Sequence, residues 1–159
     1  PDHFLSDGEL LEMTGDIVAK GGNLLLNVGP KGEDATIPDR QLSLLGTLGN
    51  WTGSQGASIF ASRPWIRPVG ESVEGHGLRY WARDRSLFVA VDQRGGSSSR
   101  GGASDSTVTL REVAPSPTTV VRTASGEPVT HPDAPEGLQC VWTPSVPWSV
   151  LEITDARCR

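Results

Sequence analysis

The residues that most constrain the fold are 21–30, which read Gly-Gly-Asn-Leu-Leu-Leu-Asn-Val-Gly-Pro. Leucines and a valine fill the centre of this run, and its only polar side chains are those of Asn23 and Asn27. An apolar run that does not alternate with polar residues is typical of a strand covered on both faces, as in a parallel α/β sheet or barrel. We therefore predict a buried strand at residues 23–28.

A helix is predicted immediately before this strand, at residues 7–20. Ser6 and Glu9 have the spacing of a capping box, in which each side chain bonds the backbone N–H of the other residue. Apolar side chains then recur at helical spacing, at Leu10, Leu11, Met13, Ile17 and Val18. Gly21 and Gly22 end the helix, because glycine adopts the left-handed conformation of the C′ position without strain. A helix, a tight turn and an apolar strand form half of a βαβ unit.

A second helix is predicted at residues 38–52. Pro38 suits the first turn, where its missing N–H leaves no hydrogen bond unmade. Leu44, Leu48 and Trp51 repeat at helical spacing. Gly46 and Gly49 weaken a helix by about 1 kcal/mol each relative to alanine. We therefore expect them to allow close approach to a neighbouring surface.

The remainder of the chain has the pattern of an all-β body. Short β-rich runs separated by proline-containing breaks are typical of an antiparallel sandwich. The predicted strands are residues 78–82, 86–92, 107–110, 118–122, 138–142 and 148–153. Residues 95–106 are almost entirely Gly, Ser and Ala, and they are expected to form a mobile loop.

Charge and composition exclude several function classes. The net charge is −5 and there is no basic stripe, which argues against nucleic-acid binding. No apolar segment reaches about 18 residues, so no membrane span is predicted. His3 lies near the start of the chain, His76 and His131 are expected in polar loops, and no ligand cluster for a metal is found. Cys140 and Cys158 permit one disulfide but do not establish it.

Several segments resemble the C-terminal part of the glycoside hydrolase family 29 α-L-fucosidases. The matching residues are 16–30 (Asp-Ile-Val-Ala-Lys-Gly-Gly-Asn-Leu-Leu-Leu-Asn-Val-Gly-Pro), 36–38 (Thr-Ile-Pro), 49–51 (Gly-Asn-Trp), 56–60 (Gly-Ala-Ser-Ile-Phe) and 63–65 (Arg-Pro-Trp). The family's usual Asp-Gly is Asp34-Ala35 here, and its usual tyrosine is Phe60. The chain opens at Pro1 without an initiator methionine, so we expect it to be the tail of a longer protein.

The resemblance implies an α/β fragment followed by an all-β antiparallel sandwich. Residues 1–65 would be the last helix–strand–helix of a (β/α)8-type catalytic barrel, and residues 66–159 the sandwich domain. It also implies a retaining α-L-fucosidase that acts on terminal fucosides of glycans, needs no cofactor, and uses two carboxyl groups about 5–5.5 Å apart. A secreted, periplasmic or lysosomal location would suit the family, although the sequence carries no targeting signal. The oligomeric state is left open.

No catalytic residue is expected within these 159 residues, because the family's nucleophile and fucose-binding histidines lie upstream. Glu33 and Asp34 are adjacent carboxylates, and we interpret them as a solvated loop. Asn27 is the one candidate substrate-binding residue, since polar side chains at the C-terminal end of a barrel strand line the active site. The alternative is that Asn27 caps loop backbone. Trp65, Trp81, Trp142 and Trp148 are expected in the sandwich core, with sugar-stacking platforms as the alternative.

Two other functions are compatible with parts of the sequence. A non-catalytic carbohydrate-binding or interaction module would explain the sandwich but not the helix–strand–helix segment. A catalytically dead family member would keep the whole pattern. For the leading hypothesis, Leu25→Ala in a complete barrel is expected to cost about 2–5 kcal/mol through the cavity it leaves.

Overall fold

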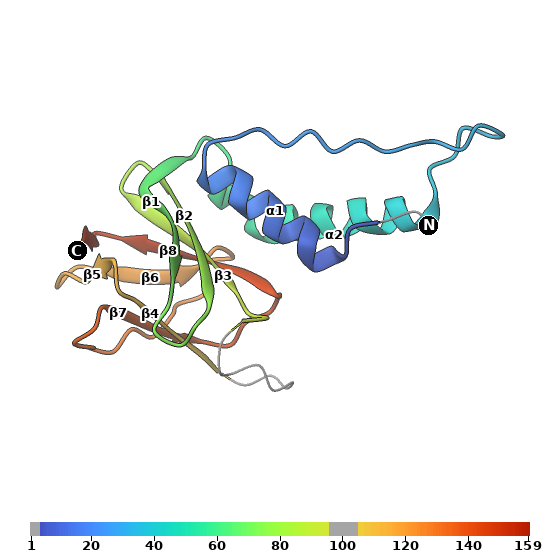
Figure 1. Ribbon diagram of the computed structural model, residues 1–159. Helices are drawn as coiled ribbons and strands as arrows, with labels where there is room; N and C mark the ends of the chain where they lie inside the picture. The colour runs from blue at the N-terminus through green and yellow to red at the C-terminus, as the bar shows by residue number, and fades with distance from the viewer. Residues whose placement is uncertain (1–3, 96–104) are drawn as a thin grey trace.

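The computed structural model, whose described residues are 4–95 and 105–159, has three layers. Two helices lie on one face of a five-stranded antiparallel sheet, and smaller two-stranded sheets cover the other face (Figure 1). The order of elements is two helices followed by strands. Both predicted helices and the antiparallel sandwich are therefore present.

The first helix, α1, spans Asp7–Ala19 and has the predicted caps at both ends. The backbone N–H of Glu9 donates to Ser6 Oγ (3.3 Å), and the N–H of Ser6 donates to Glu9 Oε2 (2.7 Å), which completes the capping box. At the other end Gly21 has φ 74°, and the N–H groups of Gly21 and Gly22 donate to Val18 O (3.0 Å) and Ile17 O (2.8 Å). These two bonds form a Schellman motif, which fixes the direction in which the chain leaves the helix.

The second helix, α2, spans Asp39–Gln55, and the 3-10 helix η1 (Gly56–Ser58) follows it. Only the C-terminal part of α2 is buried, at Trp51 and Gln55. The prediction of close packing at Gly46 and Gly49 is wrong, because a Cβ atom at either position would meet nothing within 4 Å. Those glycines face open space, since the N-terminal part of α2 extends away from the sheet (Figure 1).

The strands form three antiparallel sheets. The five-stranded sheet has the order β1-β2-β3-β8-β6, and β4-β7 and β5-β9 form the two smaller sheets. The strand bounds are β1 Arg63–Glu71, β2 Gly77–Arg83, β3 Ser86–Asp92, β4 Ser106–Leu110, β5 Val113–Ala114, β6 Val120–Thr123, β7 Leu138–Trp142, β8 Trp148–Thr154 and β9 Arg157–Cys158. Each of the six predicted strands overlaps one of these. The prediction omitted β1, β5 and β9, and β1 crosses the boundary expected between residues 65 and 66.

The central strand β3 explains how the layers are held together. Its residues from Leu87 to Val91 are all buried, because the sheet is covered on both faces. Leu87, Val89 and Val91 belong to the core between the sheets, together with side chains of β4 and β7. Phe88 and Ala90 point the other way, into a second core shared with the helices. The remaining buried members of that second core are Leu11, Ala19, Trp51, Trp81, Trp148 and Val150.

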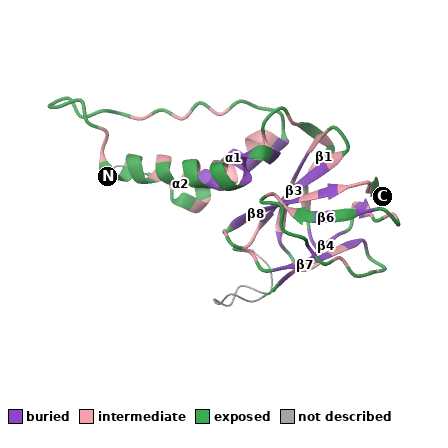
Figure 2. Ribbon diagram, turned by 180° about the vertical axis from the view of Figure 1, so that it is seen from behind, coloured by how far each residue is buried: buried purple, intermediate pink, exposed green. Residues whose placement is uncertain are grey.

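Residues 23–28 differ from the prediction in one respect: they form no strand. They are extended chain between the two helices, and Leu25 is 83% exposed (Figure 2). A β-strand needs a neighbouring strand for its N–H and C=O groups, and within the described residues none lies beside this segment. The interpretation of residues 23–28 as a strand buried on both faces is therefore wrong for this chain by itself.

Other details of the sequence analysis can also be checked. His76 lies in the turn between β1 and β2, where it is buried (1% exposed) with its Nδ1 3.0 Å from Asp92 O. Cys140 is a buried free thiol and Cys158 an exposed one, and they are not bonded to each other. His3 and most of the loop expected at 95–106 lie outside the described residues. No helix in the described part of the chain is long and apolar enough to cross a bilayer.

Candidate functional site

Asn27, the predicted substrate-binding residue, lies on the extended segment between the helices. Its side chain is exposed. Two residues later, the backbone N–H of Gly29 donates to Gln41 Oε1 of α2 (2.7 Å), which fixes the far end of the segment to that helix. No contact within the described residues gives Asn27 a partner that would identify its role, so its assignment stays a prediction.

The adjacent carboxylates Glu33 and Asp34 lie in a closed loop at residues 31–36. Lys31 N donates to Thr36 O (2.8 Å), and Ala35 N donates to Lys31 O (2.9 Å). Asp34 Oδ1 accepts hydrogen bonds from the N–H (3.0 Å) and the hydroxyl (2.7 Å) of Thr36, and these bonds lower the pKa of Asp34. An exposed carboxylate stabilised in its charged form by its own loop is suited to shaping that loop and not to donating a proton.

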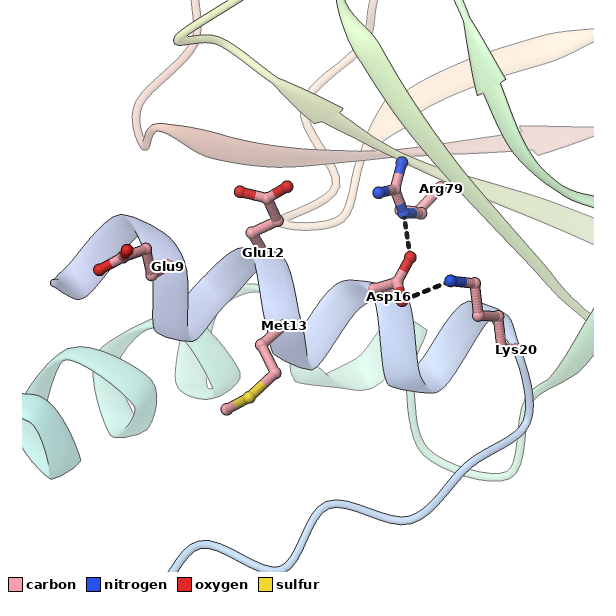
Figure 3. Close-up of a pocket in the computed structure, with 6 residues that line it drawn as sticks. All are labelled: Glu9, Glu12, Met13, Asp16, Lys20 and Arg79. Carbon is pink, nitrogen blue, oxygen red and sulfur yellow. Dashed lines mark hydrogen bonds and ion pairs between the residues drawn. The ribbon is translucent and has the colours of Figure 1, made fainter. Parts of the chain in front are cut away.

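A groove of about 470 Å³ runs along α1 beside strand β2, and it is open to solvent. Glu9, Glu12, Met13, Asp16 and Lys20 line it from the helix, and Arg79 lines it from the sheet (Figure 3). Figure 3 shows the carboxylates of Glu12 and Asp16 on the side of the helix that faces the sheet, with Met13 pointing away from Arg79. The groove is therefore a charged seam between the helical layer and the sandwich.

Asp16 is bonded to both basic residues that line this groove. Its Oδ1 accepts from Arg79 Nε (2.7 Å) and its Oδ2 from Lys20 Nζ (2.6 Å). Partial burial raises the pKa of Asp16, but the hydrogen bonds and charges of Lys20 and Arg79 outweigh burial and leave it lowered. The carboxylate is thus held ionised, and its pairing adds stability above its unfolded pKa that is lost as the pH falls through the lowered folded pKa.

The other carboxylates of the groove also have structural partners. Glu12 Oε2 accepts from Arg94 Nη2 (2.7 Å), and Arg94 also bonds both carboxylate oxygens of Asp92, at the end of β3. The hydrogen bonds that Arg94 donates to Asp92 and Glu12 raise the pKa of Arg94. Glu9 belongs to the capping box described above. Glu12 and Glu9 thus take part in contacts that hold the structure together.

The end of α2 contacts the sandwich through buried polar groups. Trp51 Nε1 donates to Trp148 O (2.8 Å), and Gln55 Oε1 accepts from the N–H of Val150 (3.1 Å). Residues 148–150 of β8 extend past the end of β6, which pairs only with residues 151–154. The two side chains therefore satisfy backbone groups that an adjacent strand would otherwise satisfy. On the neighbouring strand, Trp81 Nε1 donates to Ser58 O (2.7 Å).

The tryptophans confirm the core interpretation for the sandwich. Trp81, Trp142 and Trp148 are at most 6% exposed, so they cannot stack on a sugar in solution. Trp65 is half-buried and packs against Tyr80 with 5.1 Å between ring centroids. Across residues 4–95 and 105–159, no group of three or more His, Cys, Asp or Glu side chains could hold a metal ion.

Sequence reasoning missed the residues that join the two layers. Asp16 and Lys20 have the i,i+4 spacing of a helical ion pair, which the sequence does display. The partners Arg79 and Arg94 are far away along the chain, and their pairing depends on how α1 packs on the sheet. Trp51 was predicted as part of an apolar stripe, but its indole hydrogen bond to β8 has no sequence signal.

Comparison with known proteins gives consistent matches. The sequence model of the α-L-fucosidase family, described as "Alpha-L-fucosidase", matches residues 2–57. The α-L-fucosidase of Branchiostoma floridae is 30% identical over 88 residues, which cover 55% of this chain and 19% of that protein. The tissue α-L-fucosidase of Bos taurus is 46% identical over 72 residues, covering 45% of this chain and 14% of that protein.

Solved structures match the helices and the sandwich together. The α-fucosidase of Thermotoga maritima, in complex with a mechanism-based inhibitor, has a TM-score of 0.79 and 30% identity, and the match covers 98% of this chain and 35% of that one. α-L-Fucosidase isoenzyme 1 of Paenibacillus thiaminolyticus has a TM-score of 0.68 at 22% identity, which shows a shared fold.

This chain thus spans about a third of the solved enzymes and a fifth or less of these curated relatives. The helices, the Gly-Gly-Asn-Leu-Leu-Leu-Asn segment and the sandwich are matched as one unit, since a single superposition covers 98% of the chain. The chain belongs to the α-L-fucosidase family.

Proposed function

We propose that this chain is the C-terminal part of a retaining α-L-fucosidase that hydrolyses terminal α-L-fucosides of glycans. The observation that carries the proposal is the match of 98% of the chain to 35% of the Thermotoga maritima enzyme, which was crystallised with fucose and with a mechanism-based inhibitor. In this role residues 1–65 complete the catalytic barrel, and residues 66–159 form the accessory sandwich. The catalytic carboxylates lie outside this chain.

The exposed apolar side chains support this division. Leu25 (83% exposed) and Leu42 (49%) lie on the helical layer, outside both hydrophobic cores. Large aliphatic side chains that remain exposed outside the core are consistent with a surface that is covered in the working protein. In a complete barrel, residues 23–28 would gain strand partners on both sides, and Asn27 would lie at the C-terminal end of that strand, where substrate groups bind.

The carboxylates of this chain support the absence of catalysis within it. Retaining hydrolysis requires a nucleophile and an acid/base about 5–5.5 Å apart. Asp34 is bonded to Thr36, Asp16 to Arg79 and Lys20, and Glu12 to Arg94. Asp34 stabilises its own loop, and Asp16 and Glu12 join α1 to the sandwich. The burial of Trp81, Trp142 and Trp148 likewise weakens the alternative of a carbohydrate-binding module.

Hydrolysis of 4-nitrophenyl α-L-fucoside tests the proposal. The 159-residue chain is expected to release no nitrophenol above the buffer rate. The protein encoded by the longest reading frame that contains this chain, called the long reading frame below, is expected to turn the substrate over. The anomeric configuration of the first product, followed by NMR, should be retained. Turnover by the chain alone would contradict the proposed location of the catalytic groups, and an inactive long reading frame would contradict the fucosidase assignment.

Substitution of Leu25 gives a second test, which concerns the barrel. In this chain alone Leu25→Ala is expected to change the free energy of unfolding by less than about 0.5 kcal/mol, because the side chain is 83% exposed. In the long reading frame the same change is expected to cost about 2–5 kcal/mol, because there it removes a buried side chain. Chemical denaturation of both proteins measures the difference. Equal effects in the two proteins would mean that residues 23–28 are not covered.

A further inference from the structure

The last turn of α1 determines where the chain leaves the sandwich. The Schellman motif at Gly21 and Gly22 sets the exit direction, and the segment that carries Asn27 begins at the next residue. The turn also lies against the sandwich itself. A Cβ atom on Gly21 would come within 2.7 Å of Pro64 Cγ, on strand β1, so the backbone of the turn closely approaches that strand.

A side chain of the neighbouring strand, β2, also contacts this turn. Arg79, on β2, donates from Nε to Asp16 Oδ1 (2.7 Å) and from Nη1 to its neighbour's carbonyl, Leu78 O (3.0 Å). Its side chain is only 16% exposed, so the guanidinium is held in one orientation. Asp16 links Arg79 to the end of the helix, because its second oxygen accepts from Lys20, the C-cap residue of α1.

We propose that Arg79 is a positioning residue of the fucosidase: through Asp16 and Lys20 it fixes the end of α1, and with it the start of the segment that carries Asn27. The inference rests on the proposed function and deepens it, since it assigns the sandwich a part in placing a substrate-binding strand. The link is a chain of contacts from β2 to the helix cap, illustrated in Figure 3.

The geometry suits positioning because the contact is directional. A guanidinium is planar and donates in fixed directions, unlike an ammonium group. Asp16 and Lys20 lie on the same last turn of α1, so a rotation of that turn would break the ion pair of Asp16 with Arg79. A partly buried ion pair of this kind adds little net stability, while the loss of Asp16 leaves the guanidinium of Arg79 without this counter-charge.

Amide hydrogen exchange in the 159-residue chain tests the contact. In Arg79→Met, which keeps an unbranched apolar stem, the N–H groups of Gly21 and Gly22 are expected to exchange about 3- to 10-fold faster. Arg79→Lys should recover part of the protection. Asp16→Asn, which keeps the shape of the side chain, should accelerate the same two amides. Arg85→Met removes the ion pair of Arg85 with Asp155 elsewhere in the sandwich and should leave both amides unchanged.

Enzyme kinetics of the protein encoded by the long reading frame test whether this contact affects the reaction. Arg79→Met is expected to lower kcat/KM for 4-nitrophenyl α-L-fucoside by about 5- to 100-fold, the range expected when a substrate-contacting group is misplaced. Arg79→Lys should restore part of the loss, and Arg85→Met should keep wild-type kinetics. A purely structural role for Arg79 would lower the melting temperature without a matching change in kcat/KM at a temperature where the variant is folded.

The outcomes separate the two proposals. Wild-type exchange at Gly21 and Gly22 in both Arg79→Met and Asp16→Asn would overturn the positioning role, whatever the enzyme does. Faster exchange together with unchanged kcat/KM in an active long reading frame would overturn its link to the reaction. A long reading frame without fucosidase activity would overturn the proposed function, and with it the positioning role in that reaction, while faster exchange would still establish the contact itself.

Discussion

Replacing Trp51 with alanine is expected to lower the free energy of unfolding by about 3–5 kcal/mol, the usual cost of removing a buried tryptophan side chain. Trp51 is 2% exposed and packs in the core between the helices and the sheet. Its indole also bonds Trp148 O, which the substitution would leave buried without that partner. Because small domains are stable by only about 5–15 kcal/mol, this single change should loosen α2 from the sandwich.

Urea denaturation followed by tryptophan fluorescence measures this effect, and Trp51→Phe provides the matched control. Phenylalanine keeps most of the apolar volume but cannot donate to Trp148 O, so it is expected to cost less than alanine. The difference between the two variants then separates packing from the hydrogen bond. If Trp51→Ala changed the midpoint no more than an exposed surface substitution does, the helical layer would not be packed on the sheet as described.

Gly21→Ala is expected to destabilise the chain by about 2–4 kcal/mol, because two costs add at this position. Gly21 has φ 74°, a left-handed conformation that disfavours a Cβ atom. The new Cβ would also lie 2.7 Å from Pro64 Cγ, so β1 or the helix end must move. In the proposed enzyme the same shift would displace the start of the segment that carries Asn27, and kcat/KM should fall as well.

Gly46→Ala is the control for this prediction. Gly46 lies within α2, where a Cβ atom meets nothing within 4 Å, so alanine there should stabilise the helix by about 0.5–1 kcal/mol. Both variants add one methyl group at a helical glycine or helix end, and the predicted effects have opposite signs. Thermal or urea unfolding of the two variants measures the sign of each change in stability. Stabilisation by Gly21→Ala would mean that the Schellman turn and its contact with Pro64 do not constrain the chain.

These two predictions concern the same feature, the interface between the helical layer and the sandwich. The outer face of the five-stranded sheet carries Trp81, Phe88 and Trp148, all of which the helices cover. A sandwich without the helices would expose this apolar face. We therefore expect the helices and the sandwich to unfold together, which separates this architecture from that of an autonomous carbohydrate-binding module.

The elements that were predictable from sequence are those that depend on local interactions. The capping box at Ser6 and Glu9 and the glycine end of α1 follow from backbone groups within a few residues of one another. Strands such as β3 and β7 agree with the predicted residues because apolar runs bounded by turn residues specify them. β1 was omitted, since its two prolines and its exposed edge give it no alternating pattern.

Residues 23–28 illustrate the limit of this reasoning. Their apolar side chains predict a buried strand, but a strand exists only where another strand supplies hydrogen bonds. In this chain no described residue does so, and Leu25 is exposed. The composition of the segment is that of a covered strand, as we propose for the complete enzyme, whereas its conformation here depends on what surrounds it in this chain.

The sequence by itself determined the order of helices and strands, their caps and turns, and the family to which the chain belongs, because these depend on spacing along the chain. Only the tertiary structure decided that Arg79 contacts Asp16 and that Trp51 and Gln55 satisfy the free edge of β8. Those contacts join residues far apart in sequence. They depend on how α1 and α2 pack across the sheet, and no local pattern of residues encodes that packing.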